Sequence, residues 1–424
     1  MSNKPTQLTR KVSLFLYVPA ITAVTVVTIS LTNSIAVLWS VLLLGVILAI
    51  GFKTDVYLKT LTISAFFLRL IVIFADANLR FLPYRWDDYY HIAVAIKRNI
   101  MAGIPLFNGM VVSENTKAYS LFSSLQYLLF GDINLIVKIS NAFFAILVIL
   151  RIYQIGLTAF KDKKVAFWSA LYFAFLPSYL LYSTLDMRDS LIILISVDII
   201  YRVICNSGDQ KNIRFLFLAV DLGLMFFLRP QNIGLYAIIG LVYFFFTHVL
   251  RRPVVYKYLV AGGAIVALVL FFYWLNHSGI SKVILLRANA ILSSRAVGGS
   301  AYLKGFHYHN WVDIFKALPL RFVYFTFGPL PWDIRNLFMF MSFLEVLFVS
   351  FFFVLTLHYC LVRDRFNDVQ LLLIIFGLIG LAANSLFDSN YGTAIRHRLN
   401  YTFIFLMFGS ASLQRARMTF RRII

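Results

Sequence analysis

Long apolar stretches recur along this sequence and constrain its fold more than any other feature. A helix that crosses the hydrocarbon core of a bilayer needs about 17 to 25 mostly apolar residues. Runs of that length dominate the chain, in which 61% of the residues are hydrophobic and only 13% are charged. A chain of this composition lacks the polar residues to cover a soluble fold. We therefore predict an all-α integral membrane protein with about twelve transmembrane helices. The expected spans are, approximately, residues 12–31, 35–51, 60–79, 133–158, 164–183, 189–205, 213–228, 232–250, 256–276, 338–360, 369–387 and 399–413.

The distribution of basic residues predicts the topology of this bundle. The formal net charge is +21. The basic residues cluster in short loops that share one side if the spans alternate, and the positive-inside rule makes that side cytoplasmic. Both termini are then cytoplasmic, and two long loops, residues 80–132 and 277–337, are extracytoplasmic. Contacts with anionic membrane lipids, and not with nucleic acid, explain the positive charge. Nothing in the sequence separates soluble domains, so residues 1–424 are expected to form a single membrane domain.

Two adjacent carboxylates, Asp87 and Asp88, open an amphipathic segment in the first long loop. Ile92 and Ile96 fall on one helical face of that segment, which is typical of a helix lying at the membrane interface. Either carboxylate could cap the free amide groups at the start of this helix. A cap needs only one carboxylate, so the pair also suggests a general base, or a metal ligand, at the water interface.

Three separate loops on the predicted extracytoplasmic side carry arginine. They contribute Arg188, beside Asp186 and Asp189, then Arg229, and finally Arg396 and Arg398 around His397. Helix-end ion pairs and contacts with lipid headgroups would explain each arginine singly. A guanidinium also grips a phosphate with two parallel hydrogen bonds and stays charged at any working pH. Because all three loops face the same side, we favour a shared anionic ligand.

The second long loop contains a semi-apolar stretch and a glycine-rich stretch. Trp311–Leu330 is interrupted by proline, and we predict a helix at the outer interface in preference to a pair of short membrane dips. The glycine-rich residues 298–305 predict a mobile segment able to close over a substrate. Tyr302 and Tyr308 are candidates for stacking on sugar faces.

These segments, in their order, resemble the GT-C superfamily of multi-pass glycosyltransferases, which use polyprenyl-phosphate or dolichyl-phosphate sugars. The first loop of that superfamily carries an acidic pair, then an aromatic residue and a glycine turn, and here Asp87, Asp88, Tyr90 and Gly103 match, followed by YSLFSSLQYLLFG. ALYFAFLPSYLLYSTLDMRDSLIILI is similar to its Phe-x-Pro-Ser and Arg-Asp segment, and LRPQN and RHRLNYTFIFL look like its later arginine elements. The likeness covers roughly residues 60–240 and 385–412.

The resemblance implies a GT-C-like helix bundle with loop helices on the extracytoplasmic side, and a role for each candidate residue. Asp87 would deprotonate the acceptor hydroxyl, while Asp88 would support it or bind a divalent metal, Mg²⁺ or Mn²⁺. The residues implied to bind the donor phosphate are Arg188, Arg229, Arg396 and Arg398. Further substrate contacts are expected from Asp189, Tyr90, His91, His397, Tyr302 and Tyr308. The donor would be a polyprenyl-phosphate sugar and the acceptor a glycan, lipid or protein, with transfer by a single inverting displacement.

Two other functions fit parts of the same pattern. An O-antigen-type oligosaccharide polymerase or ligase would consume a diphosphate-linked oligosaccharide instead. A transporter or flippase of lipid-linked sugars would place polar residues near the bilayer midplane and show paired repeats. Arg69 and Arg151 are among the few charges inside the expected spans, and no repeat is visible. We therefore expect a glycosyltransferase of cell-envelope polysaccharide or glycoconjugate biosynthesis, active at the extracytoplasmic face of a bacterial plasma membrane.

Overall fold

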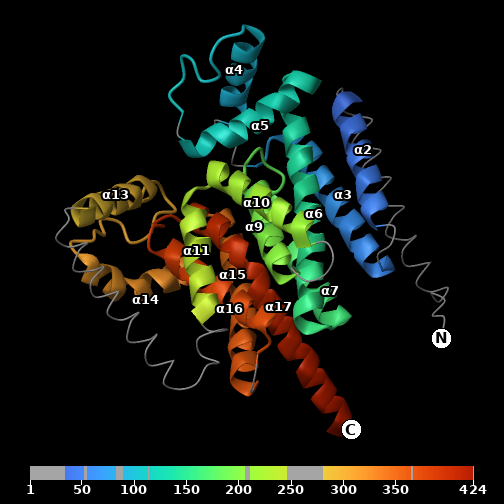
Figure 1. The fold of residues 1–424 in the computed structure, drawn as a ribbon, viewed down its shortest axis with the longest axis vertical. Helices are drawn as coiled ribbons and strands as arrows, with labels where there is room; N and C mark the ends of the chain where they lie inside the picture. The colour runs from blue at the N-terminus through green and yellow to red at the C-terminus, as the bar shows by residue number, and fades with distance from the viewer. Residues whose placement is uncertain are drawn as a thin grey trace. The chain divides into compact units, whose positions relative to one another are not determined.

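The computed structural model describes residues 34–51, 55–82, 89–112, 114–205, 211–245, 280–363 and 366–423 (Figure 1). In these ranges the chain is helical, apart from turns, loops and one isolated bridge between Ala301 and Asn390. The all-α fold class predicted from the apolar runs is therefore confirmed. The sequence predicts a single membrane domain, and the structure divides into two compact units, Met1–Gln231 and Asn232–Ile424.

The first unit is built around one long central helix. Its described helices are α2 (Ser34–Gly51), α3 (Val56–Leu79), α4 (Tyr89–Met101), α5 (Glu114–Phe130), α6 (Asn134–Phe160), α7 (Lys163–Ala174), α8 (Pro177–Tyr182), α9 (Asp189–Ile204) and α10 (Lys211–Leu228). Helix α6 packs against α2, α3, α7 and α9, and α10 packs on the other side of α9 (Figure 1). This position explains why the apolar residues of α6 are buried on nearly all sides, as expected of a helix inside a bundle.

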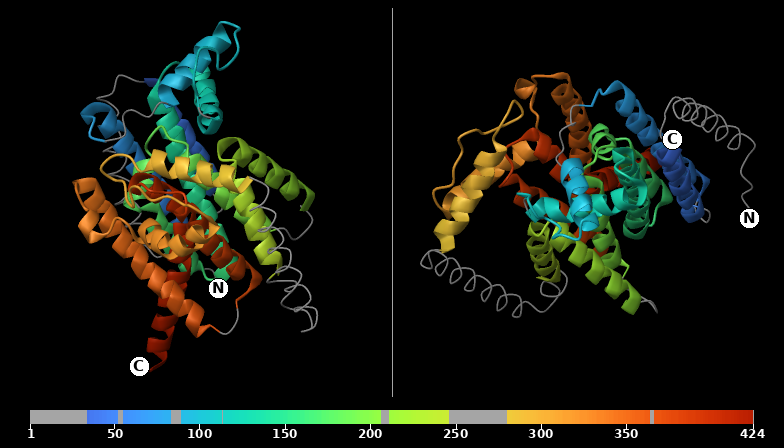
Figure 2. Two further views of the ribbon diagram at one scale, coloured as in Figure 1. Left: turned by 90° about the vertical axis from the view of Figure 1, so that its left-hand side faces the viewer. Right: turned by 90° about the horizontal axis from the view of Figure 1, so that it is seen from above.

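Helices α4 and α5 form a separate layer at one end of this unit. They pack against each other, and the left view of Figure 2 shows them together at the top of the drawing. Their connection contains Gly103 and Gly109, both with positive φ, a conformation that side chains with a Cβ atom rarely adopt. The interfacial helix predicted after the acidic pair corresponds to α4, which buries Ala93 and Ile96 against α5 and its surroundings.

A break between α7 and α8 interrupts one expected span. The sequence predicts one span over residues 164–183, and the structure has two helices because Pro177 occupies the first turn of α8. The break exposes the carbonyl of Ala174, which accepts a hydrogen bond from Arg69 Nη2 on α3 (3.1 Å). Arg69 is fully buried, and its Nε also donates to Ser183 Oγ (2.7 Å). Arg69, which the sequence places inside a span, therefore ties α3 to the end of α7 and to the end of α8.

The second unit comprises α11 (Gln231–Phe244), α13 (Ile280–Arg295), α14 (Trp311–Phe327), a 3₁₀ turn at Pro331–Asp333, α15 (Leu337–Val362), α16 (Asp368–Ser385) and α17 (Tyr391–Ile423). Helix α17 packs against α14, α15 and α16. Two glycines allow close approaches between α17 and its neighbours α15 and α16. A Cβ atom at Gly380 would lie 2.1 Å from the Tyr401 ring, and one at Gly409 would lie 2.6 Å from the Phe352 ring. The helix predicted within Trp311–Leu330 is α14, which contains Pro319 without ending there.

Five of the described helices are long and apolar enough to cross a membrane: α2, α3, α6, α15 and α16. Their bounds agree with the predicted spans to within a few residues, and the chain is an integral multi-pass membrane protein. The total of about twelve spans is not confirmed. Two of the predicted spans, residues 12–31 and 256–276, lie outside the described residues.

Candidate functional site

A buried carboxylate lies in the turn that joins α8 to α9. Asp186 is 4% exposed and accepts hydrogen bonds from the Tyr119 hydroxyl (3.1 Å) and the Tyr127 hydroxyl (3.3 Å), both from α5. Asn141 of α6 donates to the carbonyls of the two residues that flank Asp186, at 2.8 and 2.9 Å. Burial raises the pKa of Asp186 to about 6, although the two tyrosine hydroxyls and the nearby Lys138 oppose this shift. The turn is thus fixed by α5 and α6 together.

An ion pair joins α3 to α6 near the same turn. Lys138 Nζ lies 3.2 Å from Asp76 Oδ2, and Asp76 Oδ1 accepts a hydrogen bond from the backbone N–H of Leu82 (2.9 Å). Both side chains are largely buried, so the pair is shielded from water and its electrostatic interaction is stronger than at the surface. Asp76 therefore holds the chain where it leaves α3 and enters the first long loop.

Two of the predicted phosphate-binding arginines meet at the end of α10. Arg188 precedes α9, and its Nη1 donates to the carbonyl of Leu228, the last residue of α10 (2.9 Å). Arg229 follows directly and is 4% exposed. Asp189, the third residue of this cluster in the sequence, is the first residue of α9 and is also buried. The structure therefore brings Arg188 and the backbone around Arg229 together, although 40 residues separate Arg188 from its acceptor.

The start of α4 packs against the tyrosines that contact Asp186. Tyr89, which follows Asp88 in the chain, is buried and makes an edge-to-face contact with Tyr119 (centroids 4.9 Å apart). Tyr90 makes an edge-to-face contact with Tyr127 (5.7 Å) and lies beside His91 (5.3 Å). Asp87 and Asp88, predicted to be the catalytic pair, lie outside the described residues.

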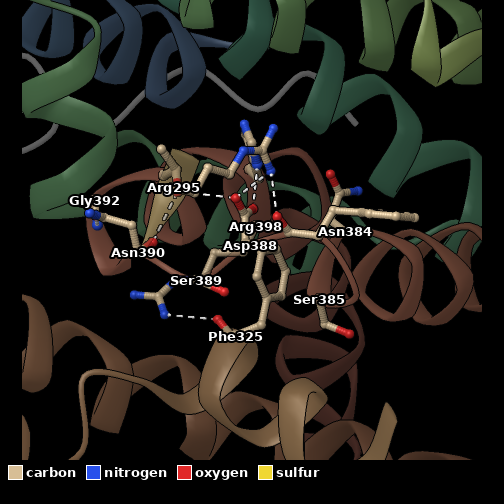
Figure 3. Close-up of polar contacts among 12 residues, drawn as sticks. Arg295, Phe325, Asn384, Ser385, Asp388, Ser389, Asn390, Gly392 and Arg398 are labelled. Carbon is tan, nitrogen blue, oxygen red and sulfur yellow. Dashed lines mark hydrogen bonds and ion pairs between the residues drawn. The ribbon is translucent and has the colours of Figure 1, made fainter. Parts of the chain in front are cut away.

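In the second unit, a fully buried carboxylate organises a cluster of basic side chains. Asp388 is 0% exposed and lies in the loop between α16 and α17 (Figure 3). Its Oδ1 pairs with Arg295 Nη1 of α13 (2.6 Å) and accepts from the Thr393 hydroxyl (3.1 Å). Its Oδ2 lies 2.5 Å from His397 Nδ1, which acts as the donor because a carboxylate only accepts. The Asp388 side chain therefore joins α13, 93 residues away, to the start of α17.

Two further arginines in this unit bind backbone carbonyls. Arg321 of α14 is fully buried, and its guanidinium donates to the carbonyls of Ser385 (3.0 Å) and Asp388 (2.5 Å). Arg398 Nη1 donates to the carbonyl of Gly328 (2.6 Å), and more weakly to that of Phe325 (3.5 Å; Figure 3). Apart from that of Asp388, which lies in the loop after α16, these carbonyls lie at the C-terminal ends of α16 and α14, where the helix dipole favours cations.

The predicted sugar-stacking tyrosines are buried among other aromatic rings. Tyr302 stacks between Tyr324 (centroids 5.6 Å apart) and Tyr391 (4.7 Å), and burial raises its pKa well above the usual value. The hydroxyl of Tyr308 donates to the carbonyl of Leu386 (2.8 Å). Both tyrosines thus shape the Asp388 loop from within, and their predicted contact with sugar remains untested.

The remaining predicted arginine, Arg396, lies on α17 and is partly buried, next to His397 in the chain. Four residues with central positions were not singled out as site residues from the sequence: Asp186, Arg295, Arg321 and Asp388. One signal was available for Arg321, because a charge inside the apolar stretch of α14 requires a buried partner. The pairing of Asp388 with Arg295, 93 residues away, had no local signal.

Within the described ranges there is no group of three or more His, Cys, Asp or Glu side chains able to hold a metal ion. A divalent metal remains a prediction that concerns Asp87 and Asp88.

Residues 117–276 match the family model described as dolichyl-phosphate-mannose-protein mannosyltransferase. The matched stretch contains the Asp186 turn, Arg188 and Arg229. No curated protein and no solved structure matches the chain. The matched stretch is less than half of the chain, and it agrees with the resemblance to GT-C membrane glycosyltransferases seen in the sequence motifs.

Proposed function

We propose that this protein transfers a single sugar from a polyprenyl-phosphate donor to a hydroxyl group of a glycan, lipid or protein at the extracytoplasmic face of the membrane. The observation that carries the proposal is the match of residues 117–276, because it coincides with the helices that assemble Asp186, Arg188 and Arg229. The family uses polyprenyl-phosphate sugars, which supports the donor class.

The arginines of the first unit suit the leaving group of this reaction. When the bond between the anomeric carbon and the phosphate oxygen breaks, negative charge grows on the lipid phosphate, and fixed cations stabilise that charge. Arg188 is oriented by its hydrogen bond to the carbonyl of Leu228, the residue before the buried Arg229. We assign the phosphate contact first to this pair. Arg396 and Arg398 are a second candidate pair. One terminal nitrogen of Arg398, Nη1, already donates to the backbone carbonyl of Gly328.

Asp87 is the proposed general base. The acceptor oxygen attacks the anomeric carbon, its proton passes to the Asp87 carboxylate, and the polyprenyl phosphate departs from the opposite face. One displacement of this kind inverts the anomeric configuration. Asp88 would orient Asp87 or bind a divalent cation, and Tyr90 and His91 follow on the first turn of α4 for contacts with the acceptor.

A test uses the full-length protein purified in detergent. It is incubated with polyprenyl-phosphate-linked hexoses and pentoses and a hydroxyl acceptor panel, and the release of polyprenyl phosphate is followed by mass spectrometry. We expect release with at least one monophosphate-linked sugar and its loss in Asp87→Asn with an unchanged melting temperature. Activity only with a diphosphate-linked oligosaccharide would contradict the proposal and support an oligosaccharide polymerase or ligase instead. Full activity of Asp87→Asn would refute the assignment of Asp87 as the base.

The proposed cellular role is cell-envelope polysaccharide or glycoconjugate biosynthesis at a bacterial plasma membrane. The topology predicted from the basic residues, with both termini in the cytoplasm, agrees with this role. It is tested by tagging each terminus with a reporter that is active on only one side of the membrane. A signal from the extracytoplasmic side at either terminus would contradict the proposed orientation.

A further inference from the structure

A cavity of about 360 Å³ opens on the first unit, far from the Asp186 turn. Its lining includes Asp55, Tyr57, Tyr153, Lys163, Lys164 and Trp168. Tyr153 lies on α6, twelve residues after Asn141, the residue that fixes the Asp186 turn. At 1.5 Å per residue the two positions are about 18 Å apart along the helix axis. The cavity is therefore distinct from the proposed site of sugar transfer.

The cavity lies where membrane-spanning helices end. Asp55 immediately precedes α3, and Lys163 begins α7 just after α6 ends at Phe160. Both α3 and α6 are candidate membrane spans, so their ends mark the boundary between hydrocarbon and water. By the predicted topology this is the cytoplasmic boundary. A volume near 360 Å³ falls at the lower end of the usual range for small-ligand sites, about 300 to 1,000 Å³.

The lining carries both positively and negatively charged side chains, which suit different groups of one ligand. Lys163 and Lys164 are exposed and present two ammonium groups, which suit a phosphate. Asp55 presents a carboxylate, and the aromatic rings around it offer π faces, which together suit an ammonium group. The rings also contact one another: Tyr57 meets Phe167 edge to face at 6.2 Å, which fixes part of the cavity wall.

Two simpler explanations account for only part of this arrangement. Interfacial aromatic residues and cytoplasmic lysines are common in membrane proteins, but they do not explain a carboxylate gathered with them in a concave site. The N-terminus of α7 is not the anion site either, because Asp162 already caps it by accepting hydrogen bonds from the N–H groups of Lys164 and Val165.

We propose that this cavity binds the headgroup of phosphatidylethanolamine from the surrounding membrane. The phosphate lies on Lys163 and Lys164, and the ammonium donates to Asp55 among the aromatic rings. The acyl chains then follow the apolar surfaces of the spans. The site is a lipid site of the scaffold and does not depend on the proposed transfer reaction.

The test is native mass spectrometry of the full-length protein in detergent, titrated separately with phosphatidylethanolamine and phosphatidylglycerol. Both lipids carry a phosphate, but only the first carries an ammonium group. We expect phosphatidylethanolamine to bind about threefold more tightly, the ratio expected for one cation contact at an exposed site. Equal or tighter binding of phosphatidylglycerol would overturn the assignment of the ammonium site. Displacement of the lipid by millimolar soluble phosphoethanolamine would show that the cavity binds the soluble compound, and it would overturn the assignment of a membrane lipid as the ligand.

Three variants locate the binding to this cavity. Asp55→Asn should abolish the preference between the two lipids, and it should fold normally because the Asp55 side chain makes no capping hydrogen bond to α3. The double variant Lys163→Gln, Lys164→Gln should weaken both lipids about tenfold or more. Lys161→Gln is the matched control, since Lys161 is exposed in the same connection but does not line the cavity. An equal loss of binding in the control and the double variant would overturn the proposal.

Discussion

Replacing Asp388 by Asn is expected to destabilise the second unit strongly. Asp388 is fully buried, and its two oxygens hold Arg295 at 2.6 Å and His397 at 2.5 Å. Asn has nearly the same shape but only one acceptor oxygen and no charge. The variant therefore leaves a guanidinium near a neutral amide, and it turns an N–H donor of that amide toward a side chain that also donates.

The expected cost follows from the exposure of the partners. Removing one member of a buried ion pair costs about 3 to 5 kcal/mol. The Arg295 side chain is 28% exposed and can recover part of its hydration, whereas that of His397 is 10% exposed. We therefore take the lower end, about 3 kcal/mol. For a folding unit of 150 to 250 residues, each kcal/mol lowers the melting temperature by about 2 to 4 °C, so the expected shift is about 6 to 12 °C.

The assay is thermal unfolding of the detergent-purified protein, followed by the loss of the monodisperse peak in size-exclusion chromatography. Asp368→Asn is the matched control, because Asp368 lies exposed in the first turn of α16 and the same chemical change should cost at most about 1 kcal/mol. A melting temperature of Asp388→Asn within 2 °C of that of the control would refute the reasoning that this carboxylate holds the loop together.

Three further predictions concern the first unit and the helix packing. Arg188→Gln should lower kcat/KM for polyprenyl phosphate release about 100-fold, as expected for the loss of one fixed charge on the leaving group; retention of more than half the activity would contradict its assignment. For Asp186, the folded-state pKa of about 6 lies above the ordinary 3.8. The folded protein therefore holds this proton more tightly, and its contribution to the free energy of unfolding is largest below pH 4 and is lost as the pH rises to about 6. Thermal unfolding between pH 4 and 7 should show the stability falling by roughly 3 kcal/mol in total, and Asp186→Asn should remove this pH dependence. An unchanged pH dependence in the variant would assign it to other groups. Gly380→Ala should cost about 1 to 3 kcal/mol in the same melting assay, because its Cβ would overlap the Tyr401 ring at 2.1 Å, whereas Gly377→Ala, with its nearest contact at 3.3 Å, should cost less; equal costs would mean that the ring can move away freely.

The apolar runs predict the membrane helices well because length and hydropathy decide them locally. The bounds of α3, α6 and α15 differ from the expected spans by only a few residues. The break before α8 was also encoded locally, by the ring of Pro177. The division into two helices was not encoded locally. It depends on a partner for the freed carbonyl of Ala174, and that partner is Arg69, 105 residues away.

The candidate site was predictable in its residue types more than in its contacts. Arg188 and Arg229 were expected to share a ligand, and in the structure Arg188 donates to the carbonyl of Leu228, the residue before Arg229. Arg398 and His397 were assigned to substrate, and the structure also gives them structural partners, the end of α14 and Asp388. Such partners come from segments 9 to 93 residues apart, and a single sequence contains no signal for their proximity.

The position of Arg69 has a consequence for turnover. Its guanidinium joins α3 to Ala174, just before the α7–α8 break, and to Ser183, just before the Asp186 turn. Rocking that turn would leave this buried cation with only the carbonyl of Ala65, in its own helix, as an acceptor among the described residues. We therefore expect the turn to stay in place during the proposed transfer reaction. Movements that admit the donor and release the product are then expected in other segments, such as the connection between α4 and α5.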